Sequence, residues 1–361
     1  MSTFYNQVKG VIYGQAIGDA LGLGTEFLSK SEVAECYPDG LKDYNKIVQD
    51  GHRRRWKIGD WTDDTDQMLC ILDSLIEKKQ VNVLDVANRI HAWVVNGGMG
   101  IGRLVASTVY SKDFLRNPHT AAKAAWKKRA KNAAPNGGIM RTSILGVWEY
   151  QDIKKVKLNA ENICKITHYD PRCIGSCVAV CVAISLMLQG VSDFDEIIRR
   201  TIKESSGYDS QVTASLEQAI NTSLQELDLD EGLNPGESNR MGYTLKTMSA
   251  GFWALKNANS YQDGILQIIH EGGDADTNGA VAGALLGAKY GMTNIPSEWV
   301  SGLYAKQELD SKIDALLAVI ESSNNRRTSM MASLLSRFFR RTENLSGRFQ
   351  NRPEQKSGLC R

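Results

Sequence analysis

Apolar residues recur at three- and four-residue spacing along most of the 361-residue chain, which is the pattern of amphipathic α-helices. The alternation of apolar and polar residues that is typical of half-buried strands is nearly absent, and only seven prolines interrupt the sequence. We therefore predict an all-α fold with many helices in one compact domain over residues 4–322. The predicted helices span residues 66–80, 84–96, 118–131, 142–150, 173–190, 192–204, 210–226, 241–257, 261–270, 278–290 and 309–321.

Glycine recurs at every fourth position in two segments, residues 10–22 and residues 279–291. A glycine inside a helix costs about 1 kcal/mol relative to alanine, so a whole face of glycine needs a structural reason. Such faces occur in membrane helices, where they let two backbones approach closely. Because Asp19, Asp274 and Asp276 lie in or beside the two segments, we instead predict two central helices packed tightly in a soluble core.

The composition is ordinary for a globular protein except at the C-terminus. The chain has 42% hydrophobic residues, 23% charged residues and a formal net charge of +2, so no nucleic-acid partner is expected. Residues 324–361 hold eight Arg and one Lys against two Glu. We predict that residues 323–361 form a basic, disordered tail. Residues 330–339 could fold there as a short amphipathic helix that contacts an acidic surface or a partner, and a solvated extension is the equal alternative.

The location of the protein is indicated only indirectly. The first twenty residues lack the basic and apolar regions of a signal peptide, and no stretch approaches 18 uncharged apolar residues, so we expect no transmembrane helix. The seven cysteines have no disulfide-framework spacing, and Cys173, Cys177 and Cys181 are interpreted as buried small hydrophobes on one helix face. A reducing, cytoplasmic location is predicted, with a nuclear one as the alternative.

Candidate chemistry begins in the stretch 59-GDWTDDTDQMLCILDSLIE-77, where four aspartates fall within seven residues. Thr62 or an aspartate before a helix is first of all an N-cap, and acids in the first turn suit the helix dipole. Helix capping and the helix dipole explain one or two of the four aspartates. A helix start with a hydroxyl and two carboxylates is also a site for a hard cation such as Mg²⁺. We predict that Asp63 and Asp64 are buried ligands, and that Asp60 and Asp66 are helix-start acids.

The same design is repeated in the second half of the chain. In 271-EGGDADTNGAVAGALLGAKYG-291, Asp274, Asp276 and Thr277 stand at the start of the second glycine-faced helix. Two oxygen-rich helix starts in one chain favour a metal site more strongly than either does alone.

Weaker candidates lie between these two segments. Glu26 follows the first glycine helix, and His168 precedes the apolar run at 173–188, where a structural role is the commoner reading for a histidine. The glycine loops at 135–141 and 96–102 could each offer backbone N–H groups to an anion, although Gly-Gly is usually only a turn.

Taken together, these motifs carry a resemblance. G-D-A-L-G followed by Glu26, T-D-D-T at 62–65, N-G-x-x-M-R at 136–141, T-H at 167–168 and G-G-D-x-D-T-x-G-A-x-x-G-A at 272–284 occur in one order along the chain. This set resembles the ADP-ribosylglycohydrolase family, which includes dinitrogenase-reductase-activating glycohydrolases and animal ADP-ribosylhydrolases. The resemblance covers about residues 8–321 and leaves out the tail.

The resemblance implies a compact, orthogonal all-α bundle with a binuclear Mg²⁺ or Mn²⁺ centre. The implied metal ligands are Thr62, Asp63, Asp64, Asp274, Asp276 and Thr277, with Glu26, Asp63 and Asp64 in catalytic roles. The implied substrate-binding residues are Gly98, Met99, Asn136, Gly137, Gly138, His168 and Tyr243.

The implied activity is hydrolysis of the glycosidic bond between ADP-ribose and a modified protein side chain or small acceptor. Two cations can chelate the ribose hydroxyls and lower the pKa of a water, while a nearby carboxylate moves the proton. The motif sequence G-G-D-A-D-T-N-G-A slightly favours arginine-linked over serine-linked ADP-ribose. Met99 departs from the family pattern, because some relatives carry an aromatic or acidic residue at that position. The alternatives are a non-catalytic, crystallin-like ADP-ribose-binding protein and a hydrolase of another ribosyl or nucleotide compound.

Overall fold

A computed structural model describes residues 3–233 and 241–322 of the chain. The predicted tail at 323–361, with its predicted helix at 330–339, lies outside the described residues, and the expected domain boundary at 322/323 stays a prediction. Met1–Asp314 form one compact unit, and Ala315–Arg361 are a second unit.

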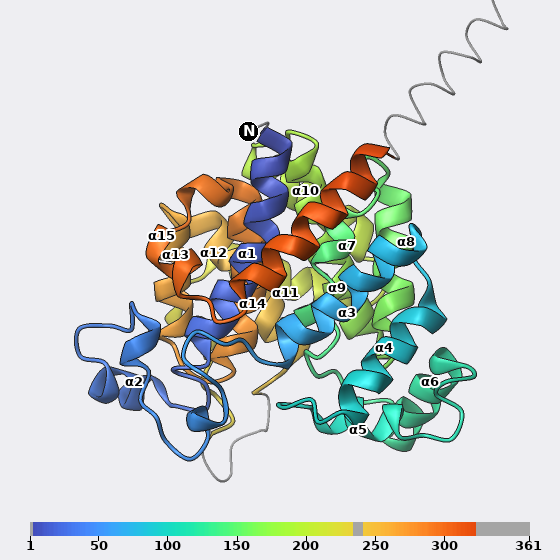
Figure 1. Ribbon diagram of the computed structural model, residues 1–361, viewed down its shortest axis with the longest axis horizontal. Helices are drawn as coiled ribbons and strands as arrows, with labels where there is room; N and C mark the ends of the chain where they lie inside the picture. The colour runs from blue at the N-terminus through green and yellow to red at the C-terminus, as the bar shows by residue number, and fades with distance from the viewer. Residues whose placement is uncertain (1–2, 234–240, 323–361) are drawn as a thin grey trace, which may run out of the picture. The chain divides into compact units, whose positions relative to one another are not determined.

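The described residues are mainly helical and include no strand, which confirms the all-α prediction (Figure 1). Short 3₁₀ turns and one isolated bridge, between Pro135 and Tyr243, complete the regular structure of this part of the chain. The helices are α1 (Thr3–Gly22), α2 (Lys30–Cys36), α3 (Asp63–Lys78), α4 (Val83–Val95), α5 (Arg103–Val109), α6 (Pro118–Lys128), α7 (Ile144–Val147), α8 (Ile153–Cys164), α9 (Pro171–Leu188), α10 (Phe194–Ser205), α11 (Ser210–Asn221), α12 (Thr244–Asn257), α13 (Tyr261–Ile269), α14 (Ala275–Tyr290) and α15 (Ser297–Gly302), and residues 306–322 are also helical.

Most predicted helices exist, but the prediction for residues 142–150 was wrong. The chain there forms a 3₁₀ turn at Ile139–Arg141 and only the four residues of α7. Glu149 then takes a left-handed conformation (φ 54°), which ends the segment. The periodicity did not predict α8, whose buried face includes the polar Asn159, or the short helices α2, α5 and α15, which carry too few turns for a clear period.

The two glycine-faced segments are α1 and α14, and they pack against each other along their lengths as predicted (Figure 1). A Cβ atom added to Gly14 would lie 2.2 Å from the carbonyl oxygen of Gly283, and one added to Gly18 would lie 2.0 Å from that of Gly279. Each backbone therefore occupies the space of the other helix's missing side chains. No residue larger than glycine fits this seam without moving a helix.

Helix α9 is the most apolar helix of the core. By length and composition Pro171–Leu188 could cross a membrane, which the sequence analysis did not anticipate, but 89% of it is buried inside the protein. Cys173, Cys177 and Cys181 are fully buried on it, which confirms their interpretation as small hydrophobes.

Three helix ends meet where α1 finishes. Gly22 lies against Ala275 at the start of α14, and Asp19 contacts the start of α3. In Figure 1 the segment between α1 and α3, which includes α2, lies at the lower left, and α5 and α6 lie at the lower right. The acidic motifs are thus brought together between these two parts of the fold.

Candidate metal centre and substrate cavity

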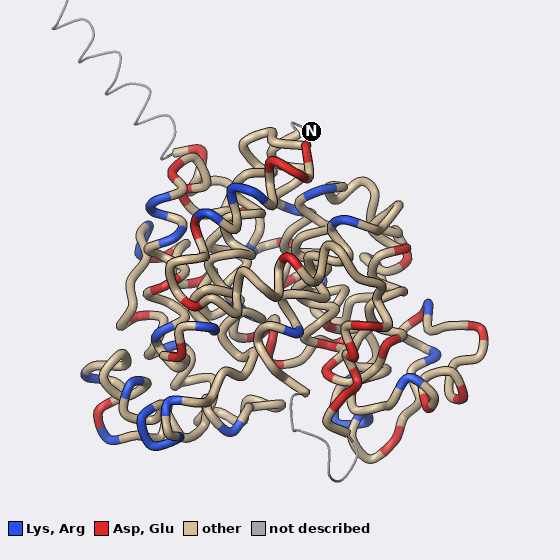
Figure 2. The backbone as a smooth tube through the Cα atoms, turned by 180° about the vertical axis from the view of Figure 1, so that it is seen from behind, with Lys and Arg blue, Asp and Glu red and all other residues tan. Residues whose placement is uncertain are grey.

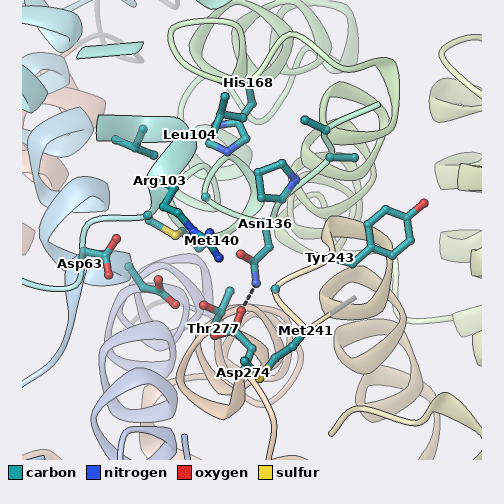
Figure 3. Close-up of a pocket in the computed structure, with 18 of the residues that line it drawn as sticks. Asp63, Arg103, Leu104, Asn136, Met140, His168, Met241, Tyr243, Asp274 and Thr277 are labelled. Carbon is teal, nitrogen blue, oxygen red and sulfur yellow. Dashed lines mark hydrogen bonds between the residues drawn. The ribbon is translucent and has the colours of Figure 1, made fainter. Parts of the chain in front are cut away.

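A cavity of about 880 Å³ opens between the segment after α1 and the segments around α5 and α6. Its lining runs from Glu26 to Thr277 in the sequence, so it exists only in the folded chain. Figure 3 shows Asp63, Arg103, Asn136 and Asp274 around the same space, although they come from different elements.

Two groups of carboxylates adjoin this cavity at the spacing of cation ligands. Asp19, Asp64 and Asp276 each offer an oxygen within 4.8 Å of the others, and so do Glu26, Asp274 and Asp276. Asp276 belongs to both groups. All of these residues except the half-buried Asp274 are buried. The first turns of α3 and α14 and the last turn of α1 thus supply a continuous acidic cluster.

Helix α3 starts inside this cluster because Asp19 of α1 caps it. The backbone N–H groups of Thr62 and Thr65 each donate to Asp19 at 3.0 Å, and the Thr65 hydroxyl donates to it at 2.6 Å. Thr62 occupies the N-cap position, but its side chain makes no capping bond, and its hydroxyl lies 3.3 Å from Asp276 Oδ2. Asp19 was not predicted as a site residue, although it lies in the G-D-A-L-G motif.

Helix α14 starts in a comparable way. Asp274 is its N-cap residue, yet its side chain makes no capping bond. Instead, Asp274 Oδ2 accepts a hydrogen bond from Asn136 Nδ2 at 2.6 Å, drawn as the dashed line in Figure 3. The Asn136 backbone N–H donates to the Gly242 carbonyl, which joins the loop 135–141 to the segment before α12. Thr277 lines the cavity, and its backbone N–H donates to Asp276 Oδ1 at 2.8 Å.

Burial and mutual repulsion disfavour the charged forms of the carboxylates in this cluster. Burial raises the pKa of Asp19 to about 7, even though its hydrogen bonds act in the opposite direction. Burial, followed by repulsion from the neighbouring carboxylates, raises the pKa values of Asp64 and Asp276 well above the usual range. Burial and repulsion from Glu26 raise the pKa of Asp274 to about 6. So many buried carboxylates can remain ionised only beside compensating positive charge.

The donor set fits a hard divalent cation. Asp64 Oδ2 is buried and has no hydrogen-bond partner among the described residues. An unpaired buried polar oxygen is costly unless a ligand satisfies it. Carboxylate and amide oxygens are the ligands that Mg²⁺ and similar cations prefer.

Asp63 is buried, as predicted, but it belongs to neither carboxylate group. Its Oδ2 accepts from Gln67 Nε2 at 3.0 Å, and Gln67 Oε1 in turn accepts from the buried guanidinium of Arg141 at 2.6 Å. Gly100 lies against its other oxygen, where a Cβ would approach to 2.4 Å. The orientation of Asp63 into the cavity is therefore set by a hydrogen-bonded chain that begins at Arg141.

Asp66 has more partners than a helix-start acid needs. The indole N–H groups of Trp61 and Trp93 each donate to it at 2.9 Å, so it anchors two aromatic residues next to the site. Asp60 is only partly buried and accepts from the backbone N–H of Trp61. Of the two acids predicted to lie at the helix start, Asp66 therefore also has a packing role.

His168 is buried and lies in a chain of hydrogen bonds. Arg141 donates to Thr167 Oγ1 at 2.6 Å, and Thr167 Oγ1 lies 2.8 Å from His168 Nδ1. We take the Thr167 hydroxyl as the donor of the second bond, which places the ring proton on Nε2. Burial, and then the charge of Arg141, lowers the pKa of His168 well below its usual range. His168 lines the cavity and its Nε2 has no partner among the described residues, so it can donate to a ligand.

Glu26 lies directly after α1, as predicted, and lines the cavity. Its Oε2 is 2.6 Å from Nε2 of His52, a residue that the sequence analysis did not consider. The His52 ring packs beside those of Phe27 and Trp56, with centroid distances of 5.0 and 5.2 Å. Phe27 has a left-handed backbone conformation (φ 60°), which turns the chain immediately after Glu26. A short aromatic segment thus holds the carboxylate beside the acidic cluster.

The residues predicted to bind substrate divide into two sets. Asn136, Gly137, His168 and Tyr243 line the cavity, whereas Gly138 lies behind it against the sulfur atoms of buried cysteines.

The loop 96–102 reaches the cavity at a different point from the one expected. Gly100 and Gly102 line it, but Gly98 and Met99 do not. A Cβ on Gly98 would lie 2.4 Å from the Trp93 ring, so the backbone is packed against that indole, and Met99 is 40% exposed. The spacing of glycines in the sequence could not distinguish these positions.

The fold and site define an all-α protein with a cluster of carboxylates beside a cavity of about 880 Å³. A family model described as ADP-ribosylglycohydrolase matches residues 1–326, and the chain belongs to this family. This membership was predicted from the sequence motifs.

Similar proteins agree with this assignment. The ADP-ribosyl-(dinitrogen reductase) glycohydrolase of Rhodospirillum rubrum is 27% identical over 87% of this chain and 97% of its own length. ADP-ribosylarginine hydrolase Tri1 of Serratia proteamaculans is 24% identical over 86% of this chain and 79% of its own. A solved structure titled "ADP-ribosylglycohydrolase-related protein complex" has the same fold, with a TM-score of 0.70, 24% identity, and coverage of 88% of this chain and 99% of that one.

Proposed function

We propose that this protein is a divalent-cation-dependent hydrolase that removes ADP-ribose from a modified protein side chain or a small acceptor. The observation that carries this proposal is the acidic cluster, in which Asp64 leaves a buried oxygen unpartnered beside a cavity of about 880 Å³. The family to which the chain belongs supplies the reaction class.

In this proposal the cluster holds two Mg²⁺ or Mn²⁺ ions. The ligands would be Thr62, Asp63, Asp64, Asp274, Asp276 and Thr277, and the position of Asp19 favours including it. When bound, such cations polarise ribose oxygens and lower the pKa of a water. The raised pKa values of the buried aspartates support this assignment, because bound cations would keep those carboxylates ionised.

Glu26 is proposed to move the proton. Water adds to C1 of the ribose, the bond from C1 to the acceptor breaks, and the acceptor leaves with a proton, so that one water is consumed. A carboxylate beside the reacting carbon can take the proton from the water and return it to the leaving group. His52 Nε2, 2.6 Å from the Glu26 carboxylate, fixes its orientation.

The ADP part of the substrate is proposed to lie along the other cavity walls. His168 Nε2–H and the backbone N–H of Gly137, which Asn136 positions through its hydrogen bonds to Gly242 and Asp274, are donors that suit a diphosphate. The Tyr243 ring lies at the far side, where its hydroxyl is within 3.4 Å of Arg172 and 3.3 Å of Gln211. This side of the cavity combines an aromatic face with polar groups, which suits an adenosine.

We propose a modest preference for arginine-linked ADP-ribose over serine-linked ADP-ribose. The motif G-G-D-A-D-T-N-G-A at residues 272–280 supports this preference. The similarity to a relative named ADP-ribosylarginine hydrolase supports it as well.

The test is a panel of ADP-ribosyl-arginine, ADP-ribosyl-serine and O-acetyl-ADP-ribose, each incubated with the protein in Mn²⁺ and in EDTA. We expect release of ADP-ribose in Mn²⁺ that EDTA abolishes, with the arginine conjugate cleaved fastest. An Asp64→Asn variant is the matched inactive control. Absence of cation-dependent release from all three compounds would refute the proposed function, and a faster serine conjugate would refute only the preference.

A further inference from the structure

The segment from Arg103 to Lys131, here called the basic lobe, carries an unusual excess of positive charge. It consists of α5, α6, the segment between them and the loop that follows α6. Asp113 is its one acidic residue. Its eight basic residues are Arg103, Lys112, Arg116, Lys123, Lys127, Lys128, Arg129 and Lys131, and all of them are exposed.

The charges of the basic lobe are not compensated within the described part of the chain. None of the eight basic residues lies within 4.0 Å of a carboxylate oxygen of the described residues, whereas basic residues elsewhere, such as Arg89, Lys165 and Lys312, form such ion pairs. Figure 2 shows the Lys and Arg positions of this lobe gathered at its lower left, with little acid among them.

The basic lobe borders the mouth of the cavity. Arg103 and Arg129 line the cavity, and Lys127, Lys128 and Lys131 follow or precede Arg129 by at most two residues. Ala130 and Lys131 both have left-handed backbone conformations (φ 53° and 58°), an uncommon arrangement for residues other than glycine. Arg129, just before this turn, and Asn132, just after it, both line the cavity.

The charge exceeds what an ADP-ribose ligand needs. A diphosphate has about two negative charges, and the two arginines that the basic lobe contributes to the cavity lining, Arg103 and Arg129, can match them. The other six basic residues lie outside the cavity lining. The segment of residues 26–60, which contributes Glu26 and Phe27 to the cavity lining, is balanced, with seven acidic and seven basic residues. The surplus is therefore on one side of the mouth and faces whatever carries the modified side chain.

We propose that the basic lobe docks the acidic surface of the ADP-ribosylated protein, on one side of the modified residue. This inference rests on the proposed function. Exposed Tyr110 and Leu115, with 66% and 44% of their surface accessible, lie in the same segment. An exposed tyrosine is typical of protein interfaces, and the chain's formal net charge of only +2 is unlike that of a nucleic-acid-binding protein, so a protein partner is favoured over a nucleic acid.

Two fluorescent peptides, each with one ADP-ribosylated arginine, test the docking. One has four Glu beside the modified residue and the other has four Gln. Their dissociation constants are measured by anisotropy in EDTA, where no turnover is expected, and hydrolysis is then followed after addition of Mn²⁺. The proteins are wild type, Lys127→Glu/Lys128→Glu, and Lys154→Glu/Lys203→Glu, whose exposed lysines lie outside the lobe and make no ion pair with the described residues.

We expect wild type to bind the Glu peptide about tenfold more tightly than the Gln peptide, a difference that high salt removes. The lobe variant should lose this preference and the control variant should keep it. Equal binding of the two peptides by wild type, or an unchanged preference in the lobe variant, would overturn the docking. A nucleic-acid oligomer that displaces the Glu peptide at lower concentration than a poly-Glu competitor would also overturn it. Failure of hydrolysis in Mn²⁺ would count against the proposed function, while the affinities in EDTA still decide the docking.

Discussion

Substitution of Gly18 by alanine probes the seam between α1 and α14 and the site at its end. The new Cβ would lie 2.0 Å from the Gly279 carbonyl oxygen and 2.5 Å from its carbon, whereas ordinary contacts begin at 3.4 Å. Both obstacles are backbone atoms, so no side chain can rotate away. The two helices have to move apart by more than about 1 Å to restore an ordinary carbon contact.

The expected cost follows from two opposing effects. Alanine improves helix propensity by about 1 kcal/mol. Overpacking costs about 1–3 kcal/mol, and a rigid backbone neighbour places this substitution at the upper end. We expect Gly18→Ala to lower the free energy of unfolding by about 2 kcal/mol. Gly207→Ala is the control: nothing lies within 4 Å of its added Cβ, so a change below about 0.5 kcal/mol is expected.

Urea unfolding in EDTA, followed by circular dichroism and by tryptophan fluorescence, measures these differences. Gly10→Ala separates stability from site geometry, because its Cβ would meet Gly287 at 2.3 Å, at the opposite end of the seam. Both seam variants should be destabilised, but only Gly18→Ala should also weaken Mn²⁺ binding, since Asp19 and Asp276 lie next to that contact. A Gly18→Ala protein as stable as Gly207→Ala would refute the packing argument.

Four further predictions concern the site. The folded-state pKa of Asp19 is about 7, above the unfolded value of about 3.9, so its contribution to stability is present at low pH and is lost as pH rises to 7. Thermal melts in EDTA should therefore show a melting temperature that falls between about pH 4 and pH 7. A pH-independent melting temperature would contradict this. The stabilisation by Mn²⁺ should grow over the same window, because protons compete with cations for the carboxylates, and should reach about 2.7 kcal/mol at 100 times the dissociation constant. Asp64→Asn removes a buried charge with an unpartnered oxygen, so the variant should melt in EDTA at or above the wild-type temperature. Its melting temperature should no longer rise when Mn²⁺ is added. A melting temperature below that of wild type in EDTA would argue against repulsion among the buried carboxylates. Thr167→Val removes the hydrogen bond that sets the His168 tautomer and should weaken ADP-ribose binding about fivefold by titration calorimetry; Thr201→Val, also buried, should have no such effect.

The sequence alone determined the local features. Helical periodicity predicted the all-α fold, because buried faces must repeat every three or four residues whatever they pack against. The glycine faces predicted a close backbone contact, and the motifs around Asp64 and Asp276 predicted both the family and an acidic site. Each of these signals resides in a short stretch of chain and needs no knowledge of its neighbours.

The residues from distant parts of the chain that complete the site are brought together only by the tertiary structure. Asp19 caps α3 across 43 positions of sequence, and His52 reaches Glu26 across 26, so neither contact has a local pattern. The tautomer of His168 depends on Arg141, whose burial the sequence could not reveal. The sequence likewise shows the basic residues of the lobe as ordinary surface charge, because only the fold reveals that they lie at the mouth of the cavity. Periodicity reports which face of an element is buried, whereas the pairing of polar groups depends on where the elements meet.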